Sequence, residues 1–194
     1  ILNVWDSEGV RYEEPKLKMM GIEAVKSSTP APCRTMIKDA LKLMMRGTED
    51  DVIEFIENAR KEFKSLPPEE IAFPRTASNV QKYKSSSDIY VKGTPIHIRG
   101  ALLFNYYLRK KKLTNKYSAI GNGEKIKFLY LKKPNTIQEN VLSFIQDFPT
   151  EFGLSQYIDY ELQFEKSFVY PLKAILDAIG WEVEKKVTLE SFFS

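Results

Sequence analysis

The stretch TPIHIRGALLFNYYLRKKK, residues 94–112, predicts the helix around which the rest of the chain is organised. Thr94 and Pro95 are residue types that suit the cap and the first turn of a helix. Four consecutive cations, residues 109–112, stand at its end. One face of this helix can pack inward, because apolar residues recur at helical spacing at Ile98, Ala101, Leu102, Phe104 and Leu108.

Composition limits the kinds of site the chain can hold. At 194 residues and 43% hydrophobic, it is long enough for one well-buried core, and its net charge is only +3. One cysteine, Cys33, cannot form an intrachain disulfide, and with a single histidine there is no ordinary zinc ligand set. Any Ser–His or Cys–His nucleophilic device would need His97, and no nucleophile pattern surrounds it. The sequence shows no membrane-spanning run and no signal peptide, which predicts a soluble intracellular protein.

The first third of the chain predicts a hairpin followed by two helices. Strands over residues 2–5 and 10–12 flank the turn DSEG, and a strand at the first residue leads us to expect partner strands upstream of Ile1. A helix opened by Thr29 and Pro30 is predicted to end at Gly47. A second begins with a Thr48–Asp51 capping box and ends at Pro67-Pro68. We expect these helices to form an antiparallel scaffold.

The remainder predicts a small sheet and further helices. Residues 71–73 suggest a short strand before a polar loop, and residues 125–131 (KIKFLYL) a strand whose partner is residues 141–145. Two more helices are predicted over residues 157–168 and 171–179. The fold class is therefore α+β: mainly helical, with small antiparallel β elements, preceded by a β-hairpin.

The last residues carry an apolar patch at a terminus, formed by Leu189, Phe192 and Phe193. Their one-turn spacing fits two structures. The segment can fold back onto the body, or it can be a short recognition helix for a partner's groove.

Several separate stretches together resemble the C-terminal part of replicative family B DNA polymerases of the T-even phage type. They occur in the family's order, at close to its spacing, across nearly the whole chain. These stretches are NVWDSEG, RY and EPKLKMMG (3–21), KSSTP (26–30), SN and KY (78–83), P and HIRG (95–100) with Asn105, GEK (123–125), and DY, EKSF and PL (159–172).

The resemblance implies three parts. Residues 1–25 would be the last strands of the palm, and residues 26–180 the thumb, which grips the minor-groove side of the primer–template duplex. Residues 181–194 would be a flexible tail whose Leu189, Phe192 and Phe193 bind a sliding clamp, with Lys186 in place of the usual first Gln. We expect the chain to act in the cytoplasm of an infected bacterium, with no membrane partner.

The resemblance also implies that the chemistry lies elsewhere. The paired Asp residues that hold two Mg²⁺ ions for nucleotidyl transfer would lie upstream of Ile1, in the palm. The fingers and the exonuclease would lie there too, as further partners. We therefore expect no catalytic residue and no metal site in this chain, and no activity of the chain alone.

A processive enzyme holds DNA without reading its sequence, so the implied contacts go to phosphates. A helix N-terminus favours phosphate, which suits the first three of the residues carried over. Carried over position by position, the DNA-binding residues are Lys26, Ser27, Ser28, Arg75, Thr76, Asn79, Lys82, Tyr83, Lys92, His97, Arg99, Lys125 and Lys166.

Some of these positions have structural alternatives. His97 and Arg99 could instead fix the start of the central helix, and Tyr83 could be a core ring with its hydroxyl at the edge. Asn140 and Tyr170 stand where relatives are expected to have Lys, so two contacts are either absent or supplied by Lys132, Lys133 or Lys173. The run at residues 109–112 has no counterpart in the family, and we expect solvated surface there.

A second hypothesis needs no polymerase. The helical body would be a stand-alone adaptor, and the apolar C-terminal peptide would be its functional element. The sequence upstream of Ile1 would separate the two hypotheses, because only the polymerase requires acidic catalytic motifs there.

Overall fold

A computed structural model describes residues 2–5, 7–17 and 26–184. It has the predicted α+β fold, with helices packed on a small antiparallel sheet. The elements are β1 (Leu2–Trp5), β2 (Arg11–Leu17), α1 (Ala31–Met44), α2 (Glu49–Ser65), α3 (Pro68–Ile71), β3 (Phe73–Thr76), η2 (Val80–Tyr83), α4 (Ile96–Lys110), β4 (Lys125–Tyr130), β5 (Val141–Phe144), η3 (Thr150–Phe152), η4 (Ser155–Tyr157), α5 (Tyr160–Phe164), the π-helical turn η5 (Glu165–Val169) and α6 (Tyr170–Asp177).

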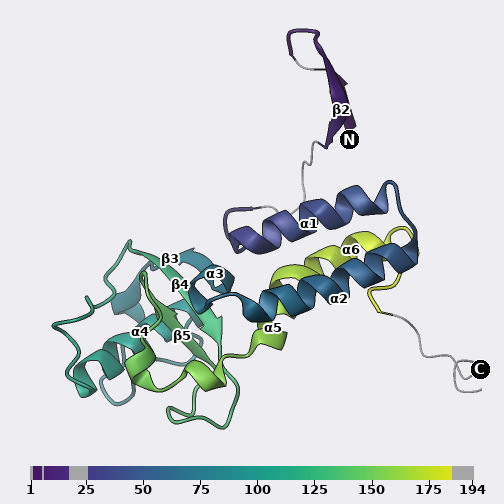
Figure 1. Ribbon diagram of the computed structural model, residues 1–194. Coiled ribbons are helices and arrows are strands. Elements are labelled where there is room, and N and C mark those ends of the chain that lie inside the picture. Colours follow the sequence, from purple (N-terminus) through teal and green to yellow (C-terminus); the bar gives the residue numbers. More distant parts are fainter. Residues whose placement is uncertain (1, 6, 18–25, 185–194) are drawn as a thin grey trace, which may run out of the picture.

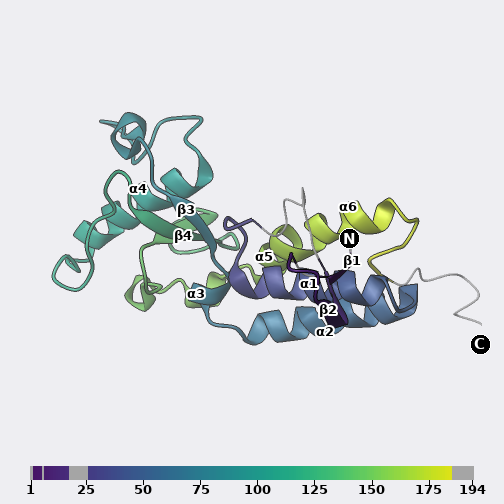
Figure 2. The same cartoon turned by 90° about the horizontal axis from the view of Figure 1, so that it is seen from above.

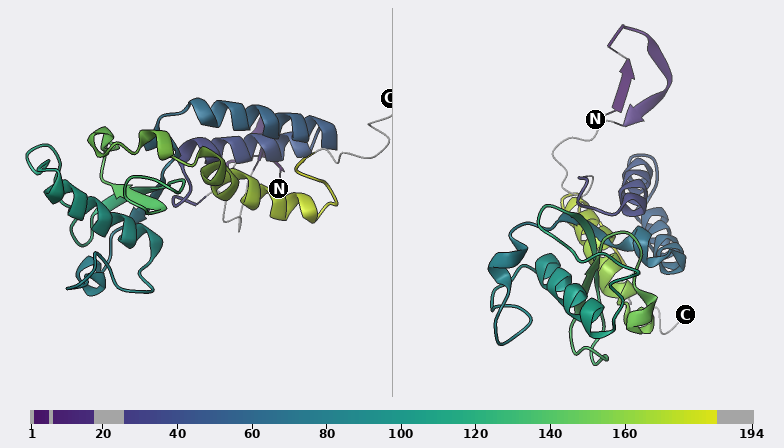
Figure 3. Two further views of the ribbon diagram at one scale, coloured as in Figure 1. Left: turned by 90° about the horizontal axis from the view of Figure 1, so that it is seen from below. Right: turned by 90° about the vertical axis from the view of Figure 1, so that its left-hand side faces the viewer.

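The body of the chain has two lobes (Figures 1 and 2). We call α1, α2, α5, η5 and α6 the helical lobe, and the three-stranded sheet with η2 and α4 the sheet lobe. The left panel of Figure 3 shows the same division from below, with α4 beside the sheet. β1 and β2 form the predicted hairpin as a separate two-stranded sheet.

Local sequence explains the pair α1 and α2, which run antiparallel as predicted (Figure 1). The Thr48–Asp51 capping box is confirmed. The Thr48 hydroxyl accepts from the Asp51 N–H, and the Asp51 carboxylate accepts from the Thr48 N–H at 2.7 Å. The carboxylate also accepts from the Thr48 hydroxyl, and the two bonds that it accepts lower the pKa of Asp51. The two reciprocal backbone bonds satisfy donors that the first turn of a helix otherwise leaves unpaired.

The sheet has the order β3-β4-β5, and every pair is antiparallel. Phe73 pairs with Phe128, and Phe128 pairs with Ser143. These side chains share one face of the sheet, because cross-strand partners in a sheet point the same way. α4 covers that face. A Cβ on Gly100 would lie 2.4 Å from the Ser143 hydroxyl oxygen, so only glycine permits this approach.

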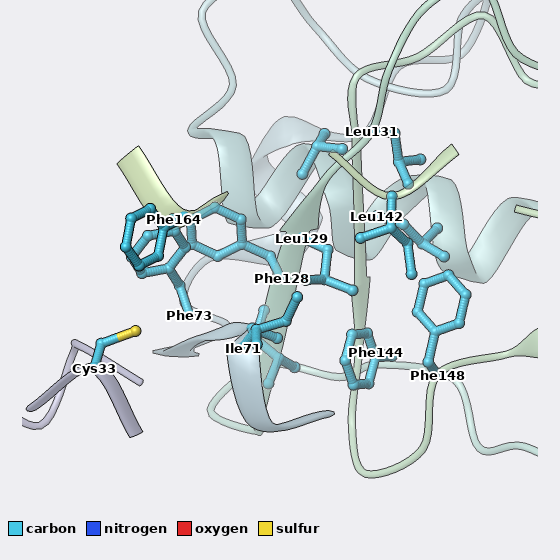
Figure 4. Packing of buried hydrophobic residues seen from close by; sticks show 14 of the residues in the cluster. Cys33, Ile71, Phe73, Phe128, Leu129, Leu131, Leu142, Phe144, Phe148 and Phe164 are labelled. Atoms are coloured by element: carbon cyan, nitrogen blue, oxygen red, sulfur yellow. The ribbon is translucent and has the colours of Figure 1, made fainter. Parts of the chain in front are cut away.

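One hydrophobic core spans both lobes. Phe73 and Phe128 stack at 5.2 Å between ring centroids, and Phe164 of α5 stacks on Phe168 at 4.9 Å. Figure 4 shows Phe73 of β3 and Phe164 of α5 among the residues of this core. Cys33 of α1 is buried in the same core, and burial raises the pKa of its thiol to about 11.

Three local predictions need correction. Ile71 ends the short helix α3 and the strand begins at Phe73, because Pro68 opens a helical turn as well as following the end of α2. Thr94 is not the cap of α4, since its hydroxyl donates to the Val91 carbonyl at 2.6 Å and Pro95 occupies the cap position. The two helices expected over residues 157–168 and 171–179 form one continuous helical path from residue 160 to 177.

The predicted clamp-binding residues Leu189, Phe192 and Phe193 lie outside the described residues. The described start of the predicted tail lies against the body. Trp181 and Val183 pack on the core, and the Glu182 N–H donates to the Glu49 carboxylate at 2.7 Å. Over the ranges that the structure covers, none of the helices is both long and apolar enough to cross a membrane.

Candidate nucleic-acid interface

Cations from three elements lie near Tyr130, the last residue of β4. Arg75 of β3 and Arg99 of α4 both lie close enough to act on the pKa of the Tyr130 phenol, which burial raises and the two guanidinium groups lower. The Lys166 ammonium of η5 lies 5.4 Å from the centre of the Tyr130 ring. We call Arg75, His97, Arg99, Tyr130 and Lys166 the Tyr130 cluster. Four of these five residues were predicted to bind DNA.

Arg75 is held by aromatic rings and by backbone. Its guanidinium carbon lies 5.5 Å from the centre of the Phe128 ring, and burial lowers its pKa. One guanidinium nitrogen donates to the carbonyls of Ser28 and Pro74, each at 2.7 Å. The bond to the Ser28 carbonyl connects this segment to the cluster. The neighbouring residues Lys26 and Ser27 are exposed.

Arg99 is held by an amide and a ring, and one of its donors has no partner in the part of the chain that the structure describes. Its Nη2 donates to the Asn140 side-chain oxygen at 2.6 Å, and its guanidinium carbon lies 5.7 Å from the centre of the Tyr90 ring. Its Nε is buried and has no hydrogen-bond partner among the described residues. A buried donor without a partner is uncommon in folded proteins. Asn140, expected only as a missing contact, orients Arg99.

The backbone of His97 ties the start of α4 to the sheet, which was one of the two roles predicted for this residue. Its backbone carbonyl accepts from the Ser143 hydroxyl at 2.8 Å, which ties the start of α4 to β5. Its half-buried ring lies 6.4 Å from the Phe128 ring. Burial lowers the pKa of His97, and the charge of Arg75 lowers it further, so the ring is neutral at pH 7.

Lys166 stands on the π-helical turn with its side chain exposed. Its ammonium lies 5.4 Å from the Tyr130 ring centre and 5.9 Å from that of Tyr170, which is itself 54% exposed. A π-turn inserts an extra residue into a helix and so re-aims the side chains on it. Two rings therefore hold the ammonium at the surface.

A second group of predicted residues lies at the C-terminal end of β3, beginning with Thr76. The Lys125 ammonium donates to the Thr76 hydroxyl at 2.9 Å across the β3–β4 pair. Asn79 is in the left-handed region (φ 58), and its N–H donates to the Asn122 side chain at 2.5 Å. Because side chains alternate along a strand, Thr76 and Lys125 point to the face opposite Arg75.

A third group lies on η2 and in the loop after it. The Lys82 ammonium lies 5.7 Å from the ring centre of Tyr83, and that ring packs partly on the core. The Val91 N–H donates to the Tyr83 carbonyl at 3.0 Å, which brings the exposed Lys92 beside this group. The predicted residues thus form three groups, and only the Tyr130 cluster joins cations from several elements.

The sequence did not lead us to the aromatic residues that hold the cations of the cluster. Tyr130, Phe128 and Tyr90 were not singled out, although alternation in KIKFLY places Phe128 and Tyr130 on one face. The cations at residues 109–112 are exposed at the opposite end of α4 from His97, as expected for solvated surface. Within the described part of the chain, no group of three or more His, Cys, Asp or Glu residues could hold a metal ion.

Comparison with known proteins gives a match over nearly the whole chain. It is 31% identical over 196 residues to a DNA-directed DNA polymerase of Enterobacteria phage T4, and 34% identical over 197 residues to one of Escherichia phage RB69. Each match covers 99% of this chain and 21% of the relative, so the chain spans about a fifth of the length of these polymerases. No protein-family model matches it. The resemblance to phage DNA polymerases inferred from the sequence is confirmed.

Proposed function

We propose that this chain is the C-terminal part of a phage family B DNA polymerase, comprising the palm edge (1–25), the thumb (26–180) and a clamp-binding tail (181–194). Its task would be to grip the primer–template duplex through backbone phosphates while the rest of the polymerase performs the chemistry. The similarity to two phage polymerases supports the assignment of the chain. The Tyr130 cluster supports the assignment of the grip.

The cluster is suited to phosphates. Arg75, Arg99 and Lys166 are each held by an aromatic ring, so they keep their positions without a bound partner. None of them forms an ion pair within the described ranges, which leaves their charge for a ligand. Phosphate contacts of this kind position a duplex and carry no sequence information.

Salt dependence tests this proposal. The chain would be titrated against duplexes of unrelated sequence between about 50 and 200 mM salt. We expect equal affinity for the sequences and a slope of log K against log salt of about −0.9 per phosphate contact, or about −2.7 from three cluster cations. Removing the charge of Lys166 (K166Q) should make the slope shallower by about 0.9, whereas Lys110→Gln in the exposed run should leave it unchanged. A flat response would contradict the proposal.

We further propose that the tail binds a sliding clamp. The apolar spacing of Leu189, Phe192 and Phe193 supports a groove-binding peptide. The packing of Trp181 on the core supports a fixed root for it. Deleting residues 189–194 should abolish binding to the phage clamp and leave DNA affinity within about twofold, because the Tyr130 cluster is untouched. Clamp binding that survives the deletion would refute this assignment.

The proposed division of labour places Mg²⁺ outside this chain. The carboxylates for nucleotidyl transfer would belong to the palm segment that precedes Ile1, where two metal ions would stabilise the attacking and leaving oxygens. Partners of this chain are then the palm, the fingers and the exonuclease, besides DNA and the clamp. Alone, the chain would bind DNA without extending a primer.

A further inference from the structure

A glutamine in α5 joins the two lobes from the inside. Gln163 is fully buried, at 0% exposure. Its Nε2 donates to the Ile71 carbonyl at the end of α3 at 2.8 Å, and its Oε1 accepts from the Tyr130 N–H at 3.1 Å. Both bonds go to backbone groups far away in the sequence.

At the Tyr130 N–H, the Gln163 side chain takes the place of the backbone acceptor that a neighbouring strand would supply. Pairing of β3 with β4 begins at Phe73 and Phe128, so β3 does not extend alongside Tyr130. On that edge the Tyr130 carbonyl accepts from the Asp159 N–H at 2.9 Å, and the Tyr130 N–H is taken by Gln163. The start of α5 therefore satisfies both polar groups of the Tyr130 backbone, as a neighbouring strand would.

The same helical path also carries Lys166. The Ser167 hydroxyl donates to the Gln163 carbonyl at 2.6 Å and accepts from the Cys33 thiol at 3.3 Å. A chain of buried hydrogen bonds thus runs from α1 through η5 to β4. Through it, Tyr130 and Lys166, which meet at 5.4 Å, are positioned by one helix.

Packing alone does not account for an amide here. A methionine of similar length would fill the space without the desolvation penalty of a buried polar group. The two backbone partners explain the glutamine, and one of them belongs to the residue at the centre of the cation cluster.

We infer that Gln163 is the positioning residue of the Tyr130 cluster, holding the sheet and the π-turn in the register that lets Arg75, Arg99 and Lys166 meet a phosphate together. This inference rests on the proposed DNA grip. Gln163 itself touches no ligand; it acts through the backbone of Tyr130.

The test compares Gln163→Met with wild type for DNA binding and for exchange of the Tyr130 amide hydrogen. Both proteins are first shown to be fully folded by circular dichroism. We expect faster exchange at Tyr130, and a salt slope shallower by about 0.9 to 1.8, equivalent to one or two lost phosphate contacts. A residue that merely stabilises the fold would not change the slope of the folded protein.

Two further variants make the result decisive. Thr48→Ala breaks the reciprocal cap of α2, away from Tyr130, and should lower stability without changing the slope. Gln163→Glu should retain the wild-type slope, because a buried, neutral carboxylic acid can still donate to Ile71 and accept from Tyr130. It also serves as the second variant if Gln163→Met does not fold, and a shallow slope would then count against the inference.

The outcomes separate the two proposals. A steep wild-type slope that Gln163→Met leaves unchanged would overturn the role of Gln163 and leave the DNA grip standing. A flat wild-type response would overturn both.

Discussion

At the scale of single residues, Arg99 is a proposed DNA contact that neighbouring side chains hold in place. Asn140 and Tyr90 hold the guanidinium, while Nε faces no acceptor among the described residues. If Arg99 contacts a phosphate as proposed, both its charge and its planar shape should contribute to DNA affinity.

The substitution Arg99→Lys separates the contribution of the positive charge to DNA binding from that of the guanidinium shape. The lysine keeps the positive charge, so the salt slope should stay within about 0.3 of wild type. It loses the planar fork and the stacking on Tyr90, so DNA affinity should fall about tenfold, or about 1.4 kcal/mol. Fluorescence anisotropy with a labelled duplex measures both quantities. Arg109→Lys, in the exposed run, is the matched control, and equal losses in the two variants would contradict the role of Arg99.

The lowered pKa of His97 should make the free energy of unfolding depend on pH. Its pKa is lowered in the folded state, chiefly by burial, and then by Arg75. As the pH falls through about 6.5, the unfolded chain therefore takes up this proton first, and the free energy of unfolding decreases. Above that pH the ring is neutral in both states and the effect is absent.

Urea unfolding at about pH 8 and about pH 6 checks this prediction. His97 is the single histidine, so the difference between wild type and His97→Gln isolates its contribution. Wild type should lose more stability than the variant between the two pH values, by up to about 1 kcal/mol. A larger loss in the variant would mean that the sign is wrong.

At the scale of elements, the sequence predicted the helices whose bounds depend on residues close together in the chain. The apolar spacing predicted α1, α2 and α4, and the Thr48–Asp51 pair predicted the start of α2. The π-turn could not be predicted, because bonds from Gln163 and Ser167 to distant groups accompany it. The centre of the site was missed for a related reason. Tyr130 meets Arg75, Arg99 and Lys166 only through sheet register and helix packing.

Gly100 is the point where α4 meets the sheet. An added methyl group would lie 2.4 Å from the Ser143 hydroxyl and 2.7 Å from its backbone nitrogen. Gly100→Ala should therefore destabilise the chain by about 1–3 kcal/mol in urea unfolding, despite the higher helix propensity of alanine. Gly121→Ala is the matched control, because its Cβ meets nothing closer than 3.9 Å. Its effect should lie within about 0.5 kcal/mol.

At the scale of the whole molecule, the question is whether the lobes unfold together. Their core is continuous. Within the helical lobe, the Phe164 ring of α5 lies 5.2 Å from the ring of Phe63 in α2. Gln163 beside Phe164 bonds β4 and α3. The ion pair between Arg60 of α2 and Glu161 of α5, at 2.6 Å, lies within the helical lobe and does not join it to the sheet lobe. The shared core and the bonds of Gln163 should therefore couple the lobes.

We therefore expect one cooperative transition. Hydrogen exchange resolved by peptide should give the slowest amides of α2 and of β4 the same free energy of opening, because neither lobe keeps its core without the other. Phe164→Leu removes ring contacts with Phe63 and Phe168 and should lower both values equally, by about 1–3 kcal/mol. Ile37→Val, inside the helical lobe, is the control for a mild core change and should also shift both free energies together.

If α2 retained its protection while β4 lost it, the sheet lobe would be an independent unit. The Tyr130 cluster could then not rely on the helical lobe for its geometry.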